Sequence, residues 1–259
     1  MPINFHDEKN SRSYASRDAD VSWAQAIKSL VDPVGRAVAD IGCGGGIYAQ
    51  AWHKIGASSI VGVDFSDAMV ETVKKRFVGD TSYTFQVGEA SATGIADGKM
   101  EIVFERALIH HLKELEPYLQ EAYRILAPNG HLLIQDRTPM DVALPGSEDH
   151  LRGYLFECYP RLLPFEQSRR WSSETVAERM SEAGFRHVQQ ITVWETRQTY
   201  ASFAELANDL RGRTGRSILH ELTDDEIEQL ILYLEQRLPK HGPIEERDRW
   251  TIWSGQKGA

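Results

Sequence analysis

Cysteine is scarce in this sequence, where only Cys43 and Cys158 occur in 259 residues. These two cysteines form neither a disulfide framework nor a Cys-x-x-Cys redox or zinc motif, so we expect no metal site and a reducing, cytoplasmic setting. The N-terminus also lacks a basic segment followed by an apolar stretch, which argues against a secretory signal. No apolar run approaches the ~18 residues that a membrane span needs.

Positive charge is in deficit, because 29 Lys and Arg stand against 38 Asp and Glu, for a net charge of −9. A phosphate backbone prefers a basic surface, so nucleic acid is a disfavoured partner. Hydrophobic residues make up 41% and charged residues 26%, which is ordinary for a globular protein and excludes a disordered or fibrous chain. The length fits one large α/β domain with an elaboration as well as it fits two domains.

Strand-like and helix-like segments alternate in the first half of the chain, which is typical of a parallel α/β sheet. We expect strands at residues 36–41, 59–64, 83–87, 101–105 and 131–135, followed by strands at 185–194 and 249–253. Ser66 and Ser172 are predicted to cap the helices that follow them.

Two segments interrupt this alternation. Residues 138–171 contain four prolines and several aromatics, which favours a cap without long regular elements. An arginine there could hold a carboxylate or phosphate, or simply lie on a solvated face; the candidates are Arg152, Arg161, Arg169 and Arg170. Residues 202–238 are helical by pattern, with a capping box at Thr223 and Glu226. We therefore expect a single domain, 1–259, with a cofactor-binding core at 35–137, a cap at 138–171 and a helical insertion at 202–238.

The most informative stretch runs from Val38 to Gly46, between a predicted strand and a predicted helix. Glycines there let the chain turn sharply and let a ligand approach with no Cβ in the way. The dinucleotide fingerprint G-x-G-x-x-G fits poorly, because its third glycine falls on Ile47 or, counted from Gly44, on Ala49, a tolerated variant. A glycine-rich turn that binds nothing is the structural alternative.

An acid precedes these glycines, with the spacing Asp40, Gly42, Gly44 and Gly46. A carboxylate there repels a pyrophosphate and attracts a cation. S-adenosylmethionine carries a sulfonium and an ammonium and no phosphate, so the charge favours it over NAD. Asp64 ends the second strand, where an acid suits hydrogen bonding to the ribose hydroxyls of either cofactor; it could also serve as a helix-start acid beside Ser66.

Five motifs in this order resemble class I S-adenosylmethionine-dependent methyltransferases, in particular the large group similar to ubiquinone/menaquinone-biosynthesis methyltransferases. They are Asp40–Gly46, Val61–Ser66, Gly88–Ala90, Ile109–Leu112 and Leu126–Ile134. The resemblance covers residues 35–137. It implies a Rossmann-like, seven-stranded, mostly parallel sheet with an antiparallel last strand, helices on both faces, a cap and a helical insertion before the last strand.

The resemblance also implies the cofactor contacts. The glycines would pass under the methionine and ribose parts, Asp64 would hold the ribose, and Phe65 and Met69 would flank the adenine. Glu89 stands where the family more often has Asp, and Arg106 stands where a small or polar residue is commoner, facing the cofactor carboxylate. An N-terminal segment would fold over the cofactor, or be an ordinary amphipathic start. The implied set is Tyr14, Arg17, Asp40, Gly42, Cys43, Gly44, Gly46, Asp64, Phe65, Met69, Glu89, Ala90 and Arg106.

His110 and His111 are the candidate general bases, because they follow the fourth strand at the rim where ligands bind in open α/β sheets. Packing or solvent exposure is the alternative for each. The region after that strand lacks the Asp/Asn-Pro-Pro-Tyr/Phe sequence of amino-methylating nucleic-acid enzymes, and no Pro-Cys pair marks a cytosine-carbon mechanism.

The sequence thus favours a cytoplasmic methyltransferase that uses S-adenosylmethionine on a small-molecule acceptor, as a monomer or homodimer without a nucleic-acid or membrane partner. The alternatives are a catalytically silent cofactor-binding or interaction protein and, less favoured, an NAD(P)-dependent oxidoreductase. The acceptor and the atom methylated stay open.

Overall fold

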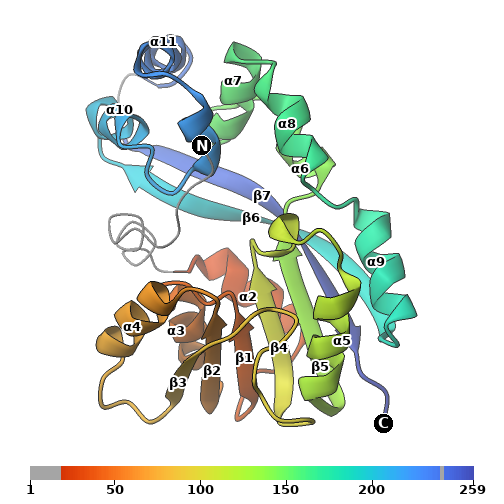
Figure 1. The fold of residues 1–259 in the computed structure, drawn as a ribbon. Helices are drawn as coiled ribbons and strands as arrows, with labels where there is room; N and C mark the ends of the chain where they lie inside the picture. The colour runs from red at the N-terminus through yellow and green to blue at the C-terminus, as the bar shows by residue number, and fades with distance from the viewer. Residues whose placement is uncertain (1–18, 240–241) are drawn as a thin grey trace. The chain divides into compact units, whose positions relative to one another are not determined.

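The computed structural model describes residues 19–239 and 242–259 (Figure 1). The described residues form two compact units. The core unit contains residues 19–136, 171–193 and 251–259, and the helical unit contains 137–170, 194–239 and 242–250. The predicted cap, except for its last residue Trp171, and the predicted insertion thus fall in one unit, while the single domain of the sequence analysis stays a prediction.

One sheet holds seven strands in the order β3-β2-β1-β4-β5-β7-β6. Strands β1 to β5 pair in parallel, and β7 pairs with β5 in the antiparallel sense. The bounds are β1 Ala37–Ile41, β2 Ser59–Asp64, β3 Tyr83–Val87, β4 Met100–Arg106, β5 Leu126–Asp136, β6 Arg186–Tyr200 and β7 Ile244–Gln256. This topology confirms the predicted Rossmann-like, mostly parallel sheet with an antiparallel last strand.

Helices cover both faces of the sheet in the core unit. Neighbouring residues of a strand point to opposite faces, so a single strand contacts the helices on both sides. Phe104 of β4 packs edge-on against Trp23 and Trp52, with ring centroids 5.7 and 5.5 Å away. Its neighbour Val103 lies in the other apolar cluster, with Leu119. The helices are α2 Val21–Leu30, α3 Ile47–Lys54, α4 Asp67–Arg76, the 3₁₀ helix η1 Ile109–His111, α5 Glu116–Ile125 and α9 Ser173–Glu182.

The predicted helix caps are confirmed. The Ser66 hydroxyl accepts from the backbone N–H of Met69 at 3.4 Å at the start of α4. The Ser172 hydroxyl does the same for Thr175 at 3.1 Å at the start of α9. Each cap satisfies a backbone donor that the helix itself leaves without a partner.

The helical unit consists of short helices and the adjoining parts of β6 and β7. The helices are α6 Pro139–Val142, α7 Leu151–Cys158, α8 Leu162–Ser168, α10 Phe203–Arg211, the 3₁₀ helix η2 Ser217–Glu221 and α11 Asp224–Glu235. Its apolar cluster joins Leu155 of α7, Leu206 of α10 and Leu230 of α11. Thr223 and Glu226 form the predicted capping box. Prolines in the first turn of α6 and of α8 are tolerated there, so short helices form where the sequence indicated only breaks.

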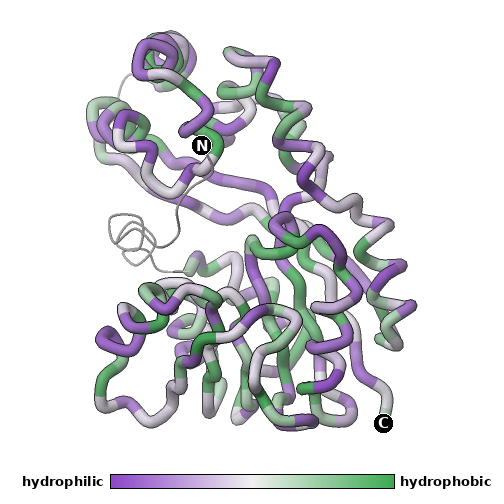
Figure 2. Tube along the Cα trace, in the orientation of Figure 1, coloured by the Kyte–Doolittle hydropathy of each residue, from purple (hydrophilic) through white to green (hydrophobic). Residues whose placement is uncertain are grey.

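Both antiparallel strands are longer than predicted. β6 ends at Tyr200 where residue 194 was expected, and β7 begins at Ile244 where residue 249 was expected. Figure 2 shows these extensions as mostly hydrophilic, unlike the strands β1, β4 and β5. Their charged residues hid the apolar pattern by which the sequence identified the other strands. None of the helices in the described part of the chain is long and apolar enough to cross a membrane.

Candidate functional site

The glycine loop between β1 and α3 has a backbone that few other residues could adopt. Gly42, Gly44 and Gly46 have φ of +74°, +49° and +77°, in the left-handed region. The carbonyl oxygen of Val63 accepts from the N–H groups of Gly42 and Cys43, at 2.7 and 3.0 Å. A Cβ at Gly42 would lie 2.5 Å from a Leu108 methyl group, so the glycine is also required by close packing.

Asp64 is fixed beside this loop by two backbone donors. Its Oδ2 accepts from Gly44 N at 2.9 Å, and its Oδ1 accepts from Ser66 N at 3.0 Å. The side chain is buried at the carboxyl end of β2. The loop and the acid expected to hold a ribose are therefore one rigid assembly.

Asp40 lies under the same loop and is only 2% exposed. Its Oδ2 has no hydrogen-bond partner among the described residues, although the amide of Ala49 favours its ionised form. Burial, and then the nearby Asp64 carboxylate, raise the pKa of Asp40 to about 7. The same two influences, burial and the neighbouring carboxylates, raise the pKa of the buried Cys43 thiol. A cation bound here would relieve the repulsion between the two acids.

The residues expected around the adenine follow β2 and β3. Phe65 is 54% exposed, whereas Met69 on α4 is buried. Glu89 is exposed and Ala90 is half-buried, in a turn closed by a bridge between Glu89 and Ala92. This turn is tied to β2, because the N–H of Gly88 donates to the Asp64 carbonyl oxygen at 3.0 Å.

Arg106 ends β4, and its guanidinium carbon lies 4.6 Å from the ring centroid of Tyr48. Tyr48 in turn contacts Trp23, at 5.2 Å between ring centroids. The next residue, Ala107, has φ of +57°, which is strained for a residue with a Cβ. The turn that follows β4 therefore has a strained backbone at Ala107, and η1 follows it at the carboxyl edge of the sheet.

His110 on η1 is paired with Asp136, the last residue of β5. Its Nδ1 lies 2.8 Å from Oδ2 of Asp136, which also accepts from the His110 backbone N–H at 3.2 Å. An ionised Asp136 selects the tautomer with the proton on Nδ1, so Nε2 becomes the acceptor. His111 is exposed, and its ring centroid lies 4.0 Å from that of His110.

Two further buried groups lie on the same sheet face as Asp136. Glu105 is 0% exposed, and neither of its oxygens makes a hydrogen bond of ordinary geometry within the described residues. Burial, and then the Asp136 carboxylate, raise its pKa well above the ordinary value, although the amides of Leu108 and Ile109 oppose this. Burial and Glu105 likewise raise the pKa of Tyr118.

The structure brings the predicted loop, the ribose acid, the adenine-side residues, Arg106 and the histidines to the carboxyl ends of β1 to β4. Tyr14 and Arg17 lie outside the described residues. Sequence reasoning missed Asp136, Glu105 and Tyr48. Asp136 could have been found, because it directly follows the strand predicted at 131–135 and the carboxyl ends of parallel strands meet at one edge of a sheet.

The chain is similar to known methyltransferases. Residues 39–134 match a family model described as a methyltransferase domain. The ubiquinone/menaquinone biosynthesis C-methyltransferase of Desulfotalea psychrophila is 34% identical over 122 residues, which are 46% of this chain and 49% of the relative. A ubiquinone biosynthesis O-methyltransferase of a Chelativorans species is 26% identical over 46% of this chain and 48% of its own length. The chain thus spans about half the length of these curated relatives.

Solved structures share the fold at low sequence identity. A phosphoethanolamine N-methyltransferase of Haemonchus contortus in complex with S-adenosyl-L-methionine aligns with a TM-score of 0.62 and 18% identity, over 99% of this chain and 60% of that one. A SAM-dependent methyltransferase of Aquifex aeolicus aligns with a TM-score of 0.57 and 17% identity, over 72% and 93%. These matches confirm the recognition of a class I S-adenosylmethionine-dependent methyltransferase fold.

Proposed function

We propose that the core unit binds S-adenosylmethionine and that this chain transfers its methyl group to a small-molecule acceptor. The observation that carries this is the pair of buried acids, Asp40 and Asp64, beside a loop of left-handed glycines. The space beside Gly44 is open, with nothing within 4 Å of where a Cβ would lie, and Asp40 has a buried oxygen without a hydrogen bond within the described residues. Such a site suits a cationic nucleoside better than a pyrophosphate.

Each residue has a proposed role in holding the cofactor. Asp64 would accept hydrogen bonds from the ribose hydroxyls, and Asp40 would face the positive charges of the methionine part. Phe65 and Met69 would flank the adenine, with Glu89 and Ala90 at its edge. Gly42, Cys43, Gly44 and Gly46 would form the floor, and Arg106 would face the carboxylate.

The chemistry requires positioning and, for a protonated acceptor, a base. The bound cofactor supplies an electrophilic methyl carbon, and its sulfur keeps the electron pair of the broken carbon–sulfur bond. His110 would take the acceptor proton on Nε2, because Asp136 engages Nδ1 and stabilises the resulting imidazolium. His111 is the second candidate for this role.

A small-molecule acceptor fits the net charge of −9, which disfavours nucleic acid. The curated relatives named above act, by their names, in quinone biosynthesis, which is a small-molecule pathway. We propose a cytoplasmic location and a monomer or homodimer on the sequence grounds given above.

Calorimetric titration with S-adenosylmethionine and with NAD tests the cofactor. We expect binding of the first only, and Asp64→Ala should weaken it by about 1–3 kcal/mol, since charged hydrogen bonds are lost. Asp67→Ala is the matched control, because Asp67 is an exposed acid one turn further along. Equal affinity of the two variants would remove Asp64 from the site, and preference for NAD would reverse the assignment.

A panel of metabolites, assayed for S-adenosylhomocysteine formation, tests methyl transfer. Turnover on at least one acceptor supports the enzyme. Tight cofactor binding without turnover on any acceptor class would favour the catalytically silent binding protein.

A further inference from the structure

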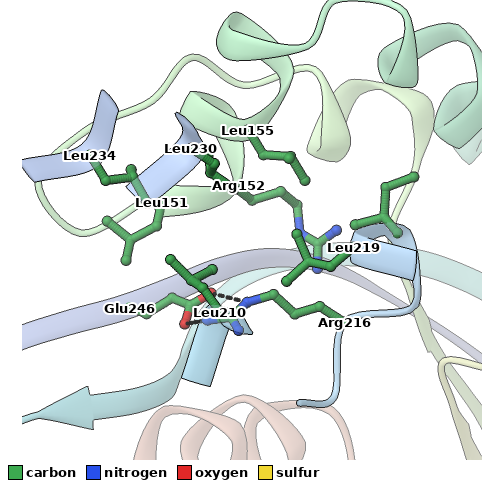
Figure 3. Close-up of a pocket in the computed structure, with 10 residues that line it drawn as sticks. Leu151, Arg152, Leu155, Leu210, Arg216, Leu219, Leu230, Leu234 and Glu246 are labelled. Atoms are coloured by element: carbon green, nitrogen blue, oxygen red, sulfur yellow. Dashed lines mark hydrogen bonds and ion pairs between the residues drawn. The ribbon is translucent and has the colours of Figure 1, made fainter. Parts of the chain in front are cut away.

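Buried polar groups without a proposed role lie in both units. In the helical unit, Arg152, Arg216 and Glu246 line a pocket together with aliphatic side chains (Figure 3). Arg216 donates to Glu246 at 3.1 Å, and the cavity volume of about 20 Å³ admits a water-sized group only. This pocket is therefore too small for an acceptor. In the core unit, the buried acid Glu105 directly precedes the turn that leads to the candidate base.

The turn between β4 and η1 determines where His110 lies. Its residue Ala107 has φ of +57°, a conformation that costs free energy and persists only where neighbouring groups hold it. The N–H of Ala107 donates to the Gln135 carbonyl oxygen at 2.8 Å, and the Trp171 indole N–H donates to the Ile109 carbonyl oxygen at 3.0 Å. These contacts hold both ends of the turn, so the strained backbone is a fixed part of the structure.

Glu105 occupies a position in β4 that suits an apolar side chain. It is 0% exposed, and it lies opposite Ile41 of β1 and Ile134 of β5. Both isoleucines belong to the apolar cluster that packs against α5, as does Val103, two residues earlier on the same face of β4. Burying an acid there costs free energy unless its oxygens have polar partners.

The carboxyl group of Glu105 interacts with the backbone of the turn. The amides of Leu108 and Ile109 favour its ionised form, which places these two N–H groups near its oxygens. The contact is looser than a hydrogen bond of ordinary geometry, which neither oxygen makes within the described residues. Buried amides need a polar partner, and the carboxyl group of Glu105 serves as one for the two amides at the start of η1.

Other titratable side chains act on Glu105 from the elements around it. Asp136 lies on the same face of β5 as the residue opposite Glu105, two positions further along, and its Oδ2 is 2.8 Å from Nδ1 of His110. Asp40 acts on Glu105 from β1, and Glu105 acts on Tyr118 of α5. Glu105 is therefore linked to the histidine in two ways, through the turn and through Asp136.

We infer that Glu105 is a positioning residue for His110, because its carboxyl group supports, from the buried side, the strained turn that leads to the histidine. Without this group the two amides lose a polar partner, and the turn relaxes at Ala107. A displacement of a catalytic group by about 1 Å costs on the order of 10²-fold in rate. The inference rests on the proposed function for the role of His110 as a base.

Two substitutions separate the polarity of this side chain from its volume. Glu105→Gln keeps an acceptor oxygen in place, whereas Glu105→Met keeps the length and removes both oxygens. Val103→Ala is the matched control, because Val103 is also fully buried on the same strand and face. For each variant we measure kcat and KM on the acceptor, the affinity for S-adenosylmethionine and urea unfolding.

The inference predicts a loss of kcat that the amide side chain rescues. Glu105→Met should lose kcat at least about tenfold with unchanged cofactor affinity, and Glu105→Gln should stay within about threefold of the wild type. Val103→Ala should lose stability and keep its kcat. Wild-type kcat in Glu105→Met, or equal losses of kcat in Glu105→Met and Val103→Ala, would overturn the inference.

An NMR titration of the full chain needs neither acceptor nor cofactor. Burial and then Asp136 raise the pKa of Glu105 well above its ordinary value, so its ionisation should appear above that value as a step in the chemical shifts of the His110 ring. The step should be absent from Glu105→Gln and should persist in Asp40→Asn and Tyr118→Phe, which remove the other titratable groups.

The titration decides even where Glu105→Met does not fold. Wild-type and Glu105→Gln curves that superimpose would overturn the inference. The same measurements keep the two proposals apart. Turnover and cofactor binding without the His110 step defeat this inference alone, and the step without cofactor binding or turnover defeats the proposed function alone.

Discussion

Several acids of the core unit are buried, and each lies in a different environment. Asp40 and Glu105 both have raised pKa values, whereas Asp136 is engaged by His110 through two hydrogen bonds. Acids whose environments push their pKa values apart take different chemical roles, one holding a proton and another a charge. We therefore propose that Asp40 faces a cationic ligand, while Asp136 holds His110.

The first residue-scale prediction concerns Asp40. Its pKa is about 7 in the free protein, and a cation beside it favours the ionised form, so cofactor binding should release a proton below pH 7. The affinity should rise by up to about tenfold per pH unit between pH 5 and 7 and then level off. Calorimetry in buffers of different ionisation enthalpy measures the proton release. The affinity of Asp40→Asn should be flat with pH, and a flat wild-type profile would place the cation elsewhere.

The same shift has a consequence for stability. An acid with a raised pKa in the folded state stabilises the fold at low pH, and this contribution is lost as pH rises from about 4 through 7. Asp40→Asn should therefore raise the thermal midpoint of the unliganded protein more at pH 8 than at pH 5. An equal gain at both values would mean that Asp40 is not buried and protonated as described.

A second residue-scale prediction concerns His110. A general base contributes about 10²–10⁴ in rate, so His110→Gln should lose at least the lower figure on the true acceptor with unchanged cofactor affinity. Asp136→Asn should lose turnover as well, because the Nδ1 partner then no longer selects the tautomer. His111→Gln is the matched control. Loss in the control alone would transfer the role to His111, and full activity in both histidine variants would mean that the acceptor needs no base.

At the scale of elements, the glycine loop depends on both backbone conformation and packing. Gly42→Ala combines a left-handed φ with a methyl group placed 2.5 Å from Leu108. Gly79→Ala is the control, because its φ is +84° and nothing lies within 4 Å of the new methyl. Left-handed strain alone costs roughly 1–2 kcal/mol. Urea unfolding should show a larger loss for Gly42→Ala than for Gly79→Ala, and equal losses would show that Leu108 moves aside freely.

The elements that the sequence could predict are those whose local signals agree. Strands β1, β2, β4 and β5 have buried apolar runs, and Ser66, Ser172 and Thr223 have side chains suited to helix caps. The end of β6 and the beginning of β7 were missed, because charged residues such as Glu246 and Asp248 point into a buried ionic network that no periodicity reveals. The proline-rich segment was read as irregular, although two of its four prolines, Pro139 and Pro164, fall in first helical turns.

The candidate site was predictable to a similar degree. Residues within one motif, such as the glycines and Asp64, follow from local spacing. The pairing of His110 with Asp136 joins residues 26 positions apart, and it depends on β4 and β5 lying side by side. Glu105 looked like an ordinary strand-end residue, since its burial beneath α5 is set by tertiary packing.

At the scale of the whole molecule, the carboxylates with the largest pKa shifts move in opposite directions in the two units. Burial raises the pKa of a carboxylate. In the helical unit, however, the neighbouring arginines outweigh burial: the pKa values of Glu166 and Glu246 fall to about 2, and that of Asp248 falls further. In the core unit, by contrast, Asp40 and Glu105 favour their protonated forms. The carboxylates whose pKa values are lowered furthest, and which therefore stabilise the fold most when ionised, lie in the helical unit.

This contrast predicts the order in which the units unfold in acid. A carboxylate with a lowered pKa stabilises the fold fully above its unfolded pKa, near 4.5, and this contribution, on the order of 3 kcal/mol for Glu246, is lost as pH falls towards 2. Brief pepsin digestion between pH 4.5 and 2.5, read by mass spectrometry, should cut within 137–170 and 194–250 before it cuts the core unit.

Glu228→Gln, in an exposed pair, should leave the order unchanged, whereas Glu246→Gln should weaken the helical unit already at pH 7, because Arg197 and Arg216 lose a buried partner. Cleavage that starts in the core unit, or in both units at one pH, would show that the arginine network does not govern the acid response.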